Sequence, residues 1–208
     1  MSALDLHVHR WVPATTDGLP TLLMLHGTGG DENDLLPLGR MVLPGAAMLS
    51  VRGNVLEHGA PRFFRRLAEG VFDLPDLHAR TLALADFLMA AANAYGFSPD
   101  SLYAVGYSNG ANIAASLILS RPEVLAGGVL LRAMVPFEPE GQVPTLAGKK
   151  VLVSAGQFDQ MIPRAGTERL VALLTEAGAS VDVVWHPVSH GLTQGDVEAA
   201  TEFFERLG

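Results

Sequence analysis

The chain has 208 residues, of which 49% are hydrophobic and 17% charged, and its formal net charge is −8. This composition excludes an intrinsically disordered chain and predicts a single domain, residues 1–208, with one buried core. The acidic balance argues against nucleic acid as a partner, and no apolar run reaches the roughly 18–20 residues needed for membrane insertion. The chain has no cysteine, so disulfides and thiolate metal sites are excluded.

The N-terminal residues 1–7 have neither the basic start nor the apolar core of a signal peptide, so we expect a cytoplasmic location. Residues 4–12 alternate between apolar and polar side chains, as in a half-exposed edge strand. His7 and His9 would lie on one solvated face of that strand. A metal site would need a third ligand, which the sequence does not suggest, so no metal is expected.

Residues 19–26 form a continuous apolar run, which is typical of a buried strand. The run ends in His26-Gly27-Thr28-Gly29-Gly30, a glycine-rich turn without the Lys-Ser/Thr of a phosphate-binding loop. The turn is either a plain tight turn or half of an oxyanion hole, and a serine motif later in the chain favours the second. We expect His26 to brace this loop by hydrogen bonding, and Asp31 to cap a helix over residues 32–41.

Residues 46–51 predict another strand, whereas residues 53–72 show no periodicity and are too many for a simple connection, so they are expected to cover a site. Phe63 and Phe64 either line a substrate pocket or pin this segment to the core. Arg65 and the neighbouring arginines either are solvated or contact an acidic group of a substrate. The candidates for a substrate pocket are Phe63, Phe64, Arg65, Met134 and Met161.

Residues 73–95 predict one long helix that Gly96 ends, and residues 102–107 predict a strand that runs straight into an alanine-rich helix over 109–120. Between them lies Gly106-Tyr107-Ser108-Asn109-Gly110. This is the G-x-S-x-G pattern of a nucleophilic serine on a sharp strand-to-helix turn, where glycines allow the tight backbone. Further strands over 124–134, 149–155 and 180–185 and helices over 163–177 and 195–207 complete a mainly parallel α/β sheet with helices on both faces.

A serine nucleophile needs an adjacent base that an acid orients. Reactive groups of open α/β sheets collect on loops after the carboxyl ends of the strands, and this rule selects Asp159 as the acid and His190 as the base. Asp182 lies inside a strand, Asp100 precedes one, and His186 is too close to a strand end. Arg132 is either paired with a carboxylate or exposed. The oxyanion would be held by the backbone N–H groups of Thr28 and Asn109.

The chain resembles the carboxylesterase/phospholipase family of small α/β-hydrolases, which includes acyl-protein thioesterases. The matching pieces are His26-Gly-Thr-Gly-Gly-Asp, Gly106-Tyr-Ser-Asn-Gly-Ala, Gly156-Gln-Phe-Asp and His190-Gly. The segments beginning at Pro61 and Arg132 are similar to the bacterial branch linked to methylhydroquinone resistance. Gln160 departs from the proline that often follows the acid. The resemblance implies an α/β-hydrolase fold with a minimal cap or none, and the triad Ser108, Asp159 and His190.

The sequence thus predicts a serine carboxylesterase that needs no cofactor and acts on a small-molecule ester of small to medium size. Two alternatives, a lysophospholipase and an acyl-protein thioesterase, would act on long acyl chains. A non-catalytic binding protein on the same scaffold is a third reading. The sequence leaves open both the natural substrate and whether the protein is a monomer or a homodimer.

Overall fold

The protein is described by a computed structural model that covers residues 3–141 and 143–207. Met1 and Ser2, which entered the interpretation of the N-terminus, lie outside the described residues. So do residues 142 and 208, and the assignment of all of 1–208 to one domain stays a prediction. No helix among the described residues is both long enough and apolar enough to cross a membrane.

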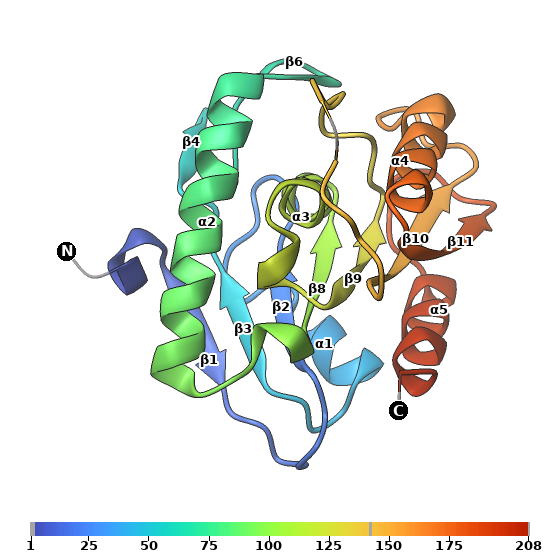
Figure 1. Ribbon diagram of the computed structural model, residues 1–208. Coiled ribbons are helices and arrows are strands. Elements are labelled where there is room, and N and C mark those ends of the chain that lie inside the picture. Colours follow the sequence, from blue (N-terminus) through green and yellow to red (C-terminus); the bar gives the residue numbers. More distant parts are fainter. Residues whose placement is uncertain (1–2, 142, 208) are drawn as a thin grey trace.

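One seven-stranded sheet forms the centre of the structure (Figure 1). Its strands lie in the order β1-β3-β2-β8-β9-β10-β11, and all neighbours are parallel except β1, which runs antiparallel to β3. The predicted mainly parallel α/β sheet is therefore confirmed. The strands are β1 (His9–Val12), β2 (Thr21–Leu25), β3 (Met48–Val51), β8 (Leu102–Tyr107), β9 (Gly127–Leu131), β10 (Lys150–Gly156) and β11 (Ser180–His186).

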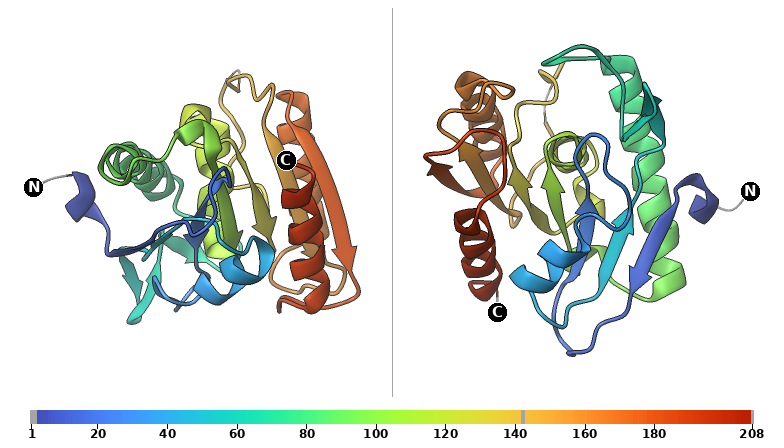
Figure 2. Two further views of the ribbon diagram at one scale, coloured as in Figure 1. Left: turned by 90° about the horizontal axis from the view of Figure 1, so that it is seen from below. Right: turned by 180° about the vertical axis from the view of Figure 1, so that it is seen from behind.

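Helices cover both faces of this sheet, as the two views of Figure 2 show. Side chains of α2, α3 and α4 build the core on one face, and those of α1 and α5 build it on the other. The helices are α1 (Leu36–Val42), α2 (Leu74–Tyr95), α3 (Asn109–Ser120), α4 (Arg164–Glu176) and α5 (Gln194–Glu205), with 3-10 turns η1 (Ala3–Leu6), η2 (Pro99–Ser101) and η3 (Pro122–Val124).

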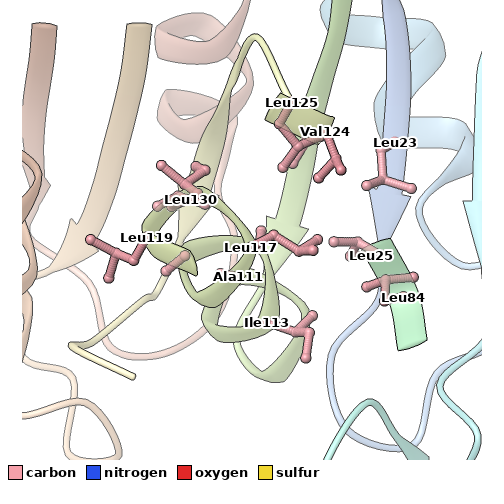
Figure 3. Close-up of a cluster of buried hydrophobic side chains, with 14 of the residues drawn as sticks. Leu23, Leu25, Leu84, Ala111, Ile113, Leu117, Leu119, Val124, Leu125 and Leu130 are labelled. Atoms are coloured by element: carbon pink, nitrogen blue, oxygen red, sulfur yellow. The ribbon is translucent and has the colours of Figure 1, made fainter. Parts of the chain in front are cut away.

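Helix α3 is the most deeply buried helix, because small side chains let it approach the sheet closely. A Cβ atom on Gly110 would lie 2.0 Å from the carbonyl oxygen of Leu25 in β2, so only glycine fits there. Figure 3 shows Ile113 and Leu117 of α3 in the same apolar cluster as Leu25 and Leu84. This packing fixes the first turn of α3, which follows Ser108, against the centre of the sheet.

Three local expectations are corrected. The strand expected over residues 4–12 is split into η1 and β1, and His7 is buried rather than solvated: its ring packs on Phe87, and its Nδ1 lies 3.2 Å from the carbonyl oxygen of Arg52. The strand expected over 124–134 is shorter, because Val124 belongs to η3, β9 begins only at Gly127, and the positive φ of Arg132 ends it after Leu131. Helix α1 begins at Leu36 rather than at residue 32, and Asp31 instead accepts a hydrogen bond from the amide of Asn33 in a turn.

The segment 53–72 folds into two small hairpins, β4 (Val55–Glu57) with β5 (Ala60–Arg62) and β6 (Arg66–Ala68) with β7 (Val71–Phe72). His58 and Gly59 both have positive φ, which suits a two-residue hairpin turn. Figure 1 shows β6 beyond the carboxyl edge of the sheet. These hairpins, rather than a separate cap domain, are what the described residues place over that edge.

Candidate active site

The predicted catalytic residues follow four strands, β2, β8, β10 and β11. Because these strands are parallel, their carboxyl ends lie at one edge of the sheet, and the loops that follow them meet there (Figure 1). Thr28 follows β2, Ser108 follows β8, Asp159 follows β10, and His190 follows β11. Residues from four distant parts of the sequence are thereby brought to one place.

Ser108 sits between β8 and α3 with a φ of 53° and a ψ of −114°, a backbone conformation that non-glycine residues rarely adopt. Such a turn exposes the serine hydroxyl above the end of the sheet. Gly106 makes the turn sterically feasible, since a Cβ there would lie 2.7 Å from the carbonyl oxygen of Gly110. The amide of Ser108 donates to the carbonyl of Leu131 at the end of β9, at 2.9 Å, and this holds the strained residue in place.

The side chains of Ser108, His190 and Asp159 form a continuous hydrogen-bonded relay. Ser108 Oγ lies 2.9 Å from His190 Nε2, and His190 Nδ1 lies 2.8 Å from Asp159 Oδ2. With an ionised Asp159, Nδ1–H donates to the carboxylate and leaves Nε2 free to accept the serine proton. The arrangement of nucleophile, base and orienting acid suits acyl transfer.

Asp159 is held so that one of its oxygens faces the histidine. Its Oδ1 accepts hydrogen bonds from the amides of Met161 and Ile162, at 2.9 and 3.0 Å, which leaves Oδ2 for His190. The Asp159 side chain is only 2% exposed. One oxygen of Asp159 therefore orders its own turn, and the other contacts the imidazole of His190.

The loop after β10, which carries Asp159, is joined to residues 187–193 after β11, which carry His190 and are called the histidine loop. The amide of Phe158 donates to the carbonyl of Val188, at 3.0 Å. Gly156, the last residue of β10, lies so close to the histidine loop that a Cβ atom would be 2.2 Å from the carbonyl oxygen of Ser189. The absence of a side chain at 156 is what lets the two loops pack against each other.

Thr28 and Asn109, whose amides are predicted to hold the oxyanion, follow β2 and β8 respectively. Asn109 is the first residue of α3, so no carbonyl of that helix accepts its amide, and the helix dipole adds partial positive charge at this point. Thr28 and Asn109 both line the cavity that opens at Ser108. That their amides form an oxyanion hole stays a prediction, with which this position at the cavity is compatible.

His26 does not belong to the hydrogen-bonded relay, because both of its ring nitrogens are engaged elsewhere. Nδ1 donates to the carbonyl of Gly27, at 2.6 Å, and Nε2 accepts from the amide of Gly53, at 2.9 Å. Burial lowers the pKa of His26, which matches a neutral ring in these two roles. The predicted bracing of the loop after β2 is thus what the structure shows.

The cavity at Ser108 has a volume of about 40 Å³. Of the pocket candidates, Met134 and Met161 line it. Phe63 and Phe64 do not: both are at most 1% exposed and belong to the apolar core, so their assignment to the pocket is corrected. Arg65 does not line it either, since its side chain points to solvent and pairs with Asp73. The lining residues are Thr28, Arg62, Arg66, Glu69, Gly70, Phe72, Ser108, Asn109, Asn112, Met134, Met161 and Ile162.

Arg62 and Arg66 line the cavity, whereas the sequence left open whether the arginines near Arg65 are solvated or contact a substrate, because residues 53–72 show no periodicity. The His58-Gly59 turn was one available signal, since its hairpin pairs Arg62 with Val55 and both are buried. Arg62 is buried; its Nη1 donates to Thr28 Oγ1, at 2.7 Å, and lies 3.3 Å from Glu57 Oε2. Arg66 Nε donates to Glu57 Oε1, at 2.9 Å. The hydrogen bond from Arg66 and the charge of Arg62 hold the pKa of Glu57 below its usual range, so both guanidinium groups share one carboxylate.

Asp182, which was rejected as the acid, and Arg132, whose surroundings the sequence left open, both form ion pairs outside the relay. Asp182 lies on the exposed edge strand β11 and pairs with Arg206 at 2.6 Å. Arg132 is fully buried and paired with a carboxylate, Asp196. Among the described residues, no group of three or more His, Asp or Glu side chains is placed to hold a metal ion.

Comparison with known proteins assigns the family. The dienelactone hydrolase family model matches residues 70–203. MhqD of Bacillus subtilis (strain 168) is 47% identical over 197 residues, which cover 95% of this chain and 97% of MhqD. The chain belongs to the dienelactone hydrolase family, and the resemblance to the carboxylesterase and acyl-protein thioesterase group, including its methylhydroquinone-resistance branch, is confirmed.

Solved structures agree with this assignment. The crystal structure of the Bacillus cereus carboxylesterase superposes with a TM-score of 0.94 and 48% identity, covering 97% of this chain and 95% of that one. The structure of YahD with malic acid superposes with a TM-score of 0.91 and 28% identity, covering 97% and 100%. The protein thus has the α/β-hydrolase fold, without a cap domain in the described residues, and is a hydrolase of the esterase type.

Proposed function

We propose that the protein is a serine carboxylesterase that cleaves small to medium carboxylic esters through an acyl-enzyme on Ser108. The observation that carries the proposal is the continuous relay from Ser108 Oγ through His190 to Asp159, at 2.9 and 2.8 Å. The proposal assigns Ser108 as the nucleophile, His190 as the general base and acid, and Asp159 as the group that orients the imidazole.

In the first half-reaction Ser108 Oγ attacks the ester carbonyl and gives its proton to His190 Nε2. The oxyanion of the tetrahedral intermediate accepts hydrogen bonds from the amides of Thr28 and Asn109. The intermediate collapses, the bond to the leaving alcohol breaks, and His190 donates the proton to that alcohol. A water molecule then attacks the acyl-enzyme with His190 again as base, which releases the acid and restores Ser108. No step requires a cofactor.

The size of the cavity supports a short acyl group rather than a long acyl chain. Its volume of about 40 Å³ is only about three times the 10–15 Å³ that one water molecule needs by the same measure. A lysophospholipase or an acyl-protein thioesterase would need an apolar groove along the surface instead. A series of p-nitrophenyl esters with acyl chains of about 2 to 12 carbons separates these activities. We expect kcat/KM to fall beyond about four to six carbons.

The walls of the cavity favour an ester whose acyl or alcohol part carries hydrogen-bond acceptors. Arg62 and Arg66 line it, and Glu69, the acid among the lining residues, is exposed to solvent, which screens its charge. YahD, which shares the fold at 28% identity, was solved with malic acid, a small dicarboxylic acid. We therefore expect esters that carry a free carboxylate to be among the better substrates.

The central test is Ser108→Ala. It should abolish turnover of a short p-nitrophenyl ester and labelling by a fluorophosphonate, which reacts with an activated serine by forming an O–P bond and releasing fluoride. The matched control is Ser180→Ala, at an exposed serine that begins β11. Undiminished turnover or labelling in Ser108→Ala would refute the assignment. A wild-type protein that folds but is neither active nor labelled would instead favour a binding function.

A further inference from the structure

The buried side chain of Arg132 has no part in the relay, yet it lies directly beneath the loop that carries the proposed base. Arg132 follows β9, is 0% exposed, and has a φ of 58°, in the left-handed region that non-glycine residues rarely occupy. Its amide donates to the carbonyl of Ser154 in β10, at 2.8 Å. This backbone conformation sends the side chain under the edge of the sheet at which β9, β10 and β11 end.

The guanidinium of Arg132 makes one contact with the histidine loop itself. Nη2 donates to the carbonyl oxygen of Gly191, the residue directly after His190, at 2.8 Å. Tyr107, the last residue of β8, donates its hydroxyl to the carbonyl oxygen of His190, at 3.2 Å. Burial raises the pKa of Tyr107, so this hydroxyl stays protonated and remains a donor. Two successive carbonyl groups, those of residues 190 and 191, are therefore held by two side chains from neighbouring strands.

Asp196 fixes the position of the Arg132 guanidinium, which in turn holds the carbonyl of Gly191. Arg132 Nη1 and Nη2 bind the two carboxylate oxygens of Asp196, each at 2.8 Å, in a bidentate pair. Asp196 Oδ1 also accepts from Ser154 Oγ, at 2.6 Å, and Oδ2 accepts from the amide of Thr193, at 2.7 Å. Burial alone would raise the pKa of Asp196, but the hydrogen bonds from Arg132, Ser154 and Thr193 hold it below its usual value.

This network clamps the chain on the C-terminal side of His190 at two places, Gly191 and Thr193. A buried ion pair is a poor source of stability, because desolvation of the two charges offsets much of their attraction. Its value here is geometric, since a bidentate pair with two further hydrogen bonds has one low-energy arrangement. The Leu131 carbonyl, one residue earlier, holds the amide of Ser108. The end of β9 thus connects the loop of the nucleophile with the loop of the base.

We propose that Arg132, assisted by Tyr107, is a positioning residue that sets the distance between His190 and Ser108 by holding the carbonyl of Gly191. The inference rests on the proposed triad. Arg132 touches neither the substrate nor the reacting atoms, so it acts only through the backbone that carries the imidazole. Displacement of a catalytic group by about 1 Å typically costs about 10²-fold in rate, so loss of the clamp should lower kcat while substrate binding is little changed.

The experiment uses three variants of the whole protein. Arg132→Lys keeps the charge but cannot bind Asp196 in a bidentate manner and reach Gly191 at once. The double variant Arg132→Met, Asp196→Leu replaces the ion pair by apolar side chains, which such sites often tolerate in stability. Tyr107→Phe removes a single hydroxyl and folds even if the others do not. The matched control is Thr81→Val, which removes a buried hydroxyl that bonds Ser116 between α2 and α3 and has no contact with Arg132 or Asp196.

Kinetics with a short p-nitrophenyl ester and thermal unfolding are measured for each variant. We expect kcat to fall about 10- to 100-fold in the two Arg132 variants and about threefold in Tyr107→Phe, with KM within about twofold of the wild-type value. Thr81→Val should lower Tm but keep kcat within about twofold. A folded Arg132 variant with wild-type kcat overturns the proposal, and so does an unchanged kcat in Tyr107→Phe if neither Arg132 variant folds. Because wild-type turnover and its loss in Ser108→Ala are measured in parallel, failure of the triad itself is recognised separately.

Discussion

A methyl group added at Gly156 should disable the enzyme without touching a catalytic side chain. In Gly156→Ala the new Cβ would lie 2.2 Å from the carbonyl oxygen of Ser189 and 2.7 Å from that of Val188. Ordinary contact begins at 3.4 Å, and both obstructing atoms belong to the backbone, so no side-chain rotation relieves the overlap. The histidine loop must therefore retreat by about 1.2 Å from the end of β10.

A displacement of that size is enough to break the hydrogen bond between His190 and Ser108. His190 is the residue after Ser189, so its Nε2 moves away from Ser108 Oγ, from which it is now 2.9 Å distant. A misplacement of about 1 Å costs about 10²-fold, so we expect kcat to fall by roughly two orders of magnitude. Overpacking should also cost about 1–3 kcal/mol of stability. For a chain of this size each kcal/mol corresponds to a decrease in Tm of about 2–4 °C.

The assay combines steady-state hydrolysis of a short p-nitrophenyl ester with thermal unfolding monitored by circular dichroism. The matched control is Gly141→Ala, where an added methyl would meet no described atom within 4 Å and φ is not positive. The control should retain both kcat and Tm. A Gly156→Ala protein that is folded and fully active would show that the two loops adjust without disturbing His190, and would refute the reasoning.

Three further outcomes are expected. Arg66→Gln should lower kcat/KM about fivefold for an ester that carries a free carboxylate, but not for the neutral ester in which that carboxylate is methylated. The loss is limited because one partly exposed ion pair contributes at most about 1 kcal/mol. Equal losses on both esters would exclude recognition of the carboxylate by charge. Burial lowers the pKa of His26 below 6.5, so near that pH the unfolded chain binds a proton that the folded chain does not. The free energy of unfolding should therefore fall as pH decreases below about 6.5, with a limiting slope of about 1.4 kcal/mol per pH unit. Urea unfolding between pH 7.5 and 5.5 should show that this free energy depends less steeply on pH in His26→Gln. Phe63→Ala should cost about 3–5 kcal/mol of stability with KM almost unchanged, because this side chain fills the core and not the cavity. A large rise in KM without destabilisation would show that Phe63 contacts the substrate.

The sequence by itself determined the parts of the protein that depend on local pattern and on topology. Apolar runs alternating with helical periodicity imply a parallel sheet, and a parallel sheet gathers the loops that follow its strands at one edge. Ser108, Asp159 and His190 could therefore be selected without coordinates, because each follows a strand. The turn at Ser108 could be predicted because a strand that runs so sharply into a helix leaves no room for side chains at Gly106 and Gly110.

Only the tertiary structure decided what lies around these residues. Phe63 and Phe64 occur in a segment without periodicity, so nothing in their spacing said which way they point, and packing against the sheet turned them into the core. Arg132 and Asp196 are 64 residues apart, and their pairing beneath the histidine loop follows from where β9 and α5 happen to meet. Such contacts cannot be predicted from a single sequence, because three-dimensional packing, and not spacing along the chain, decides which side chains of different elements meet.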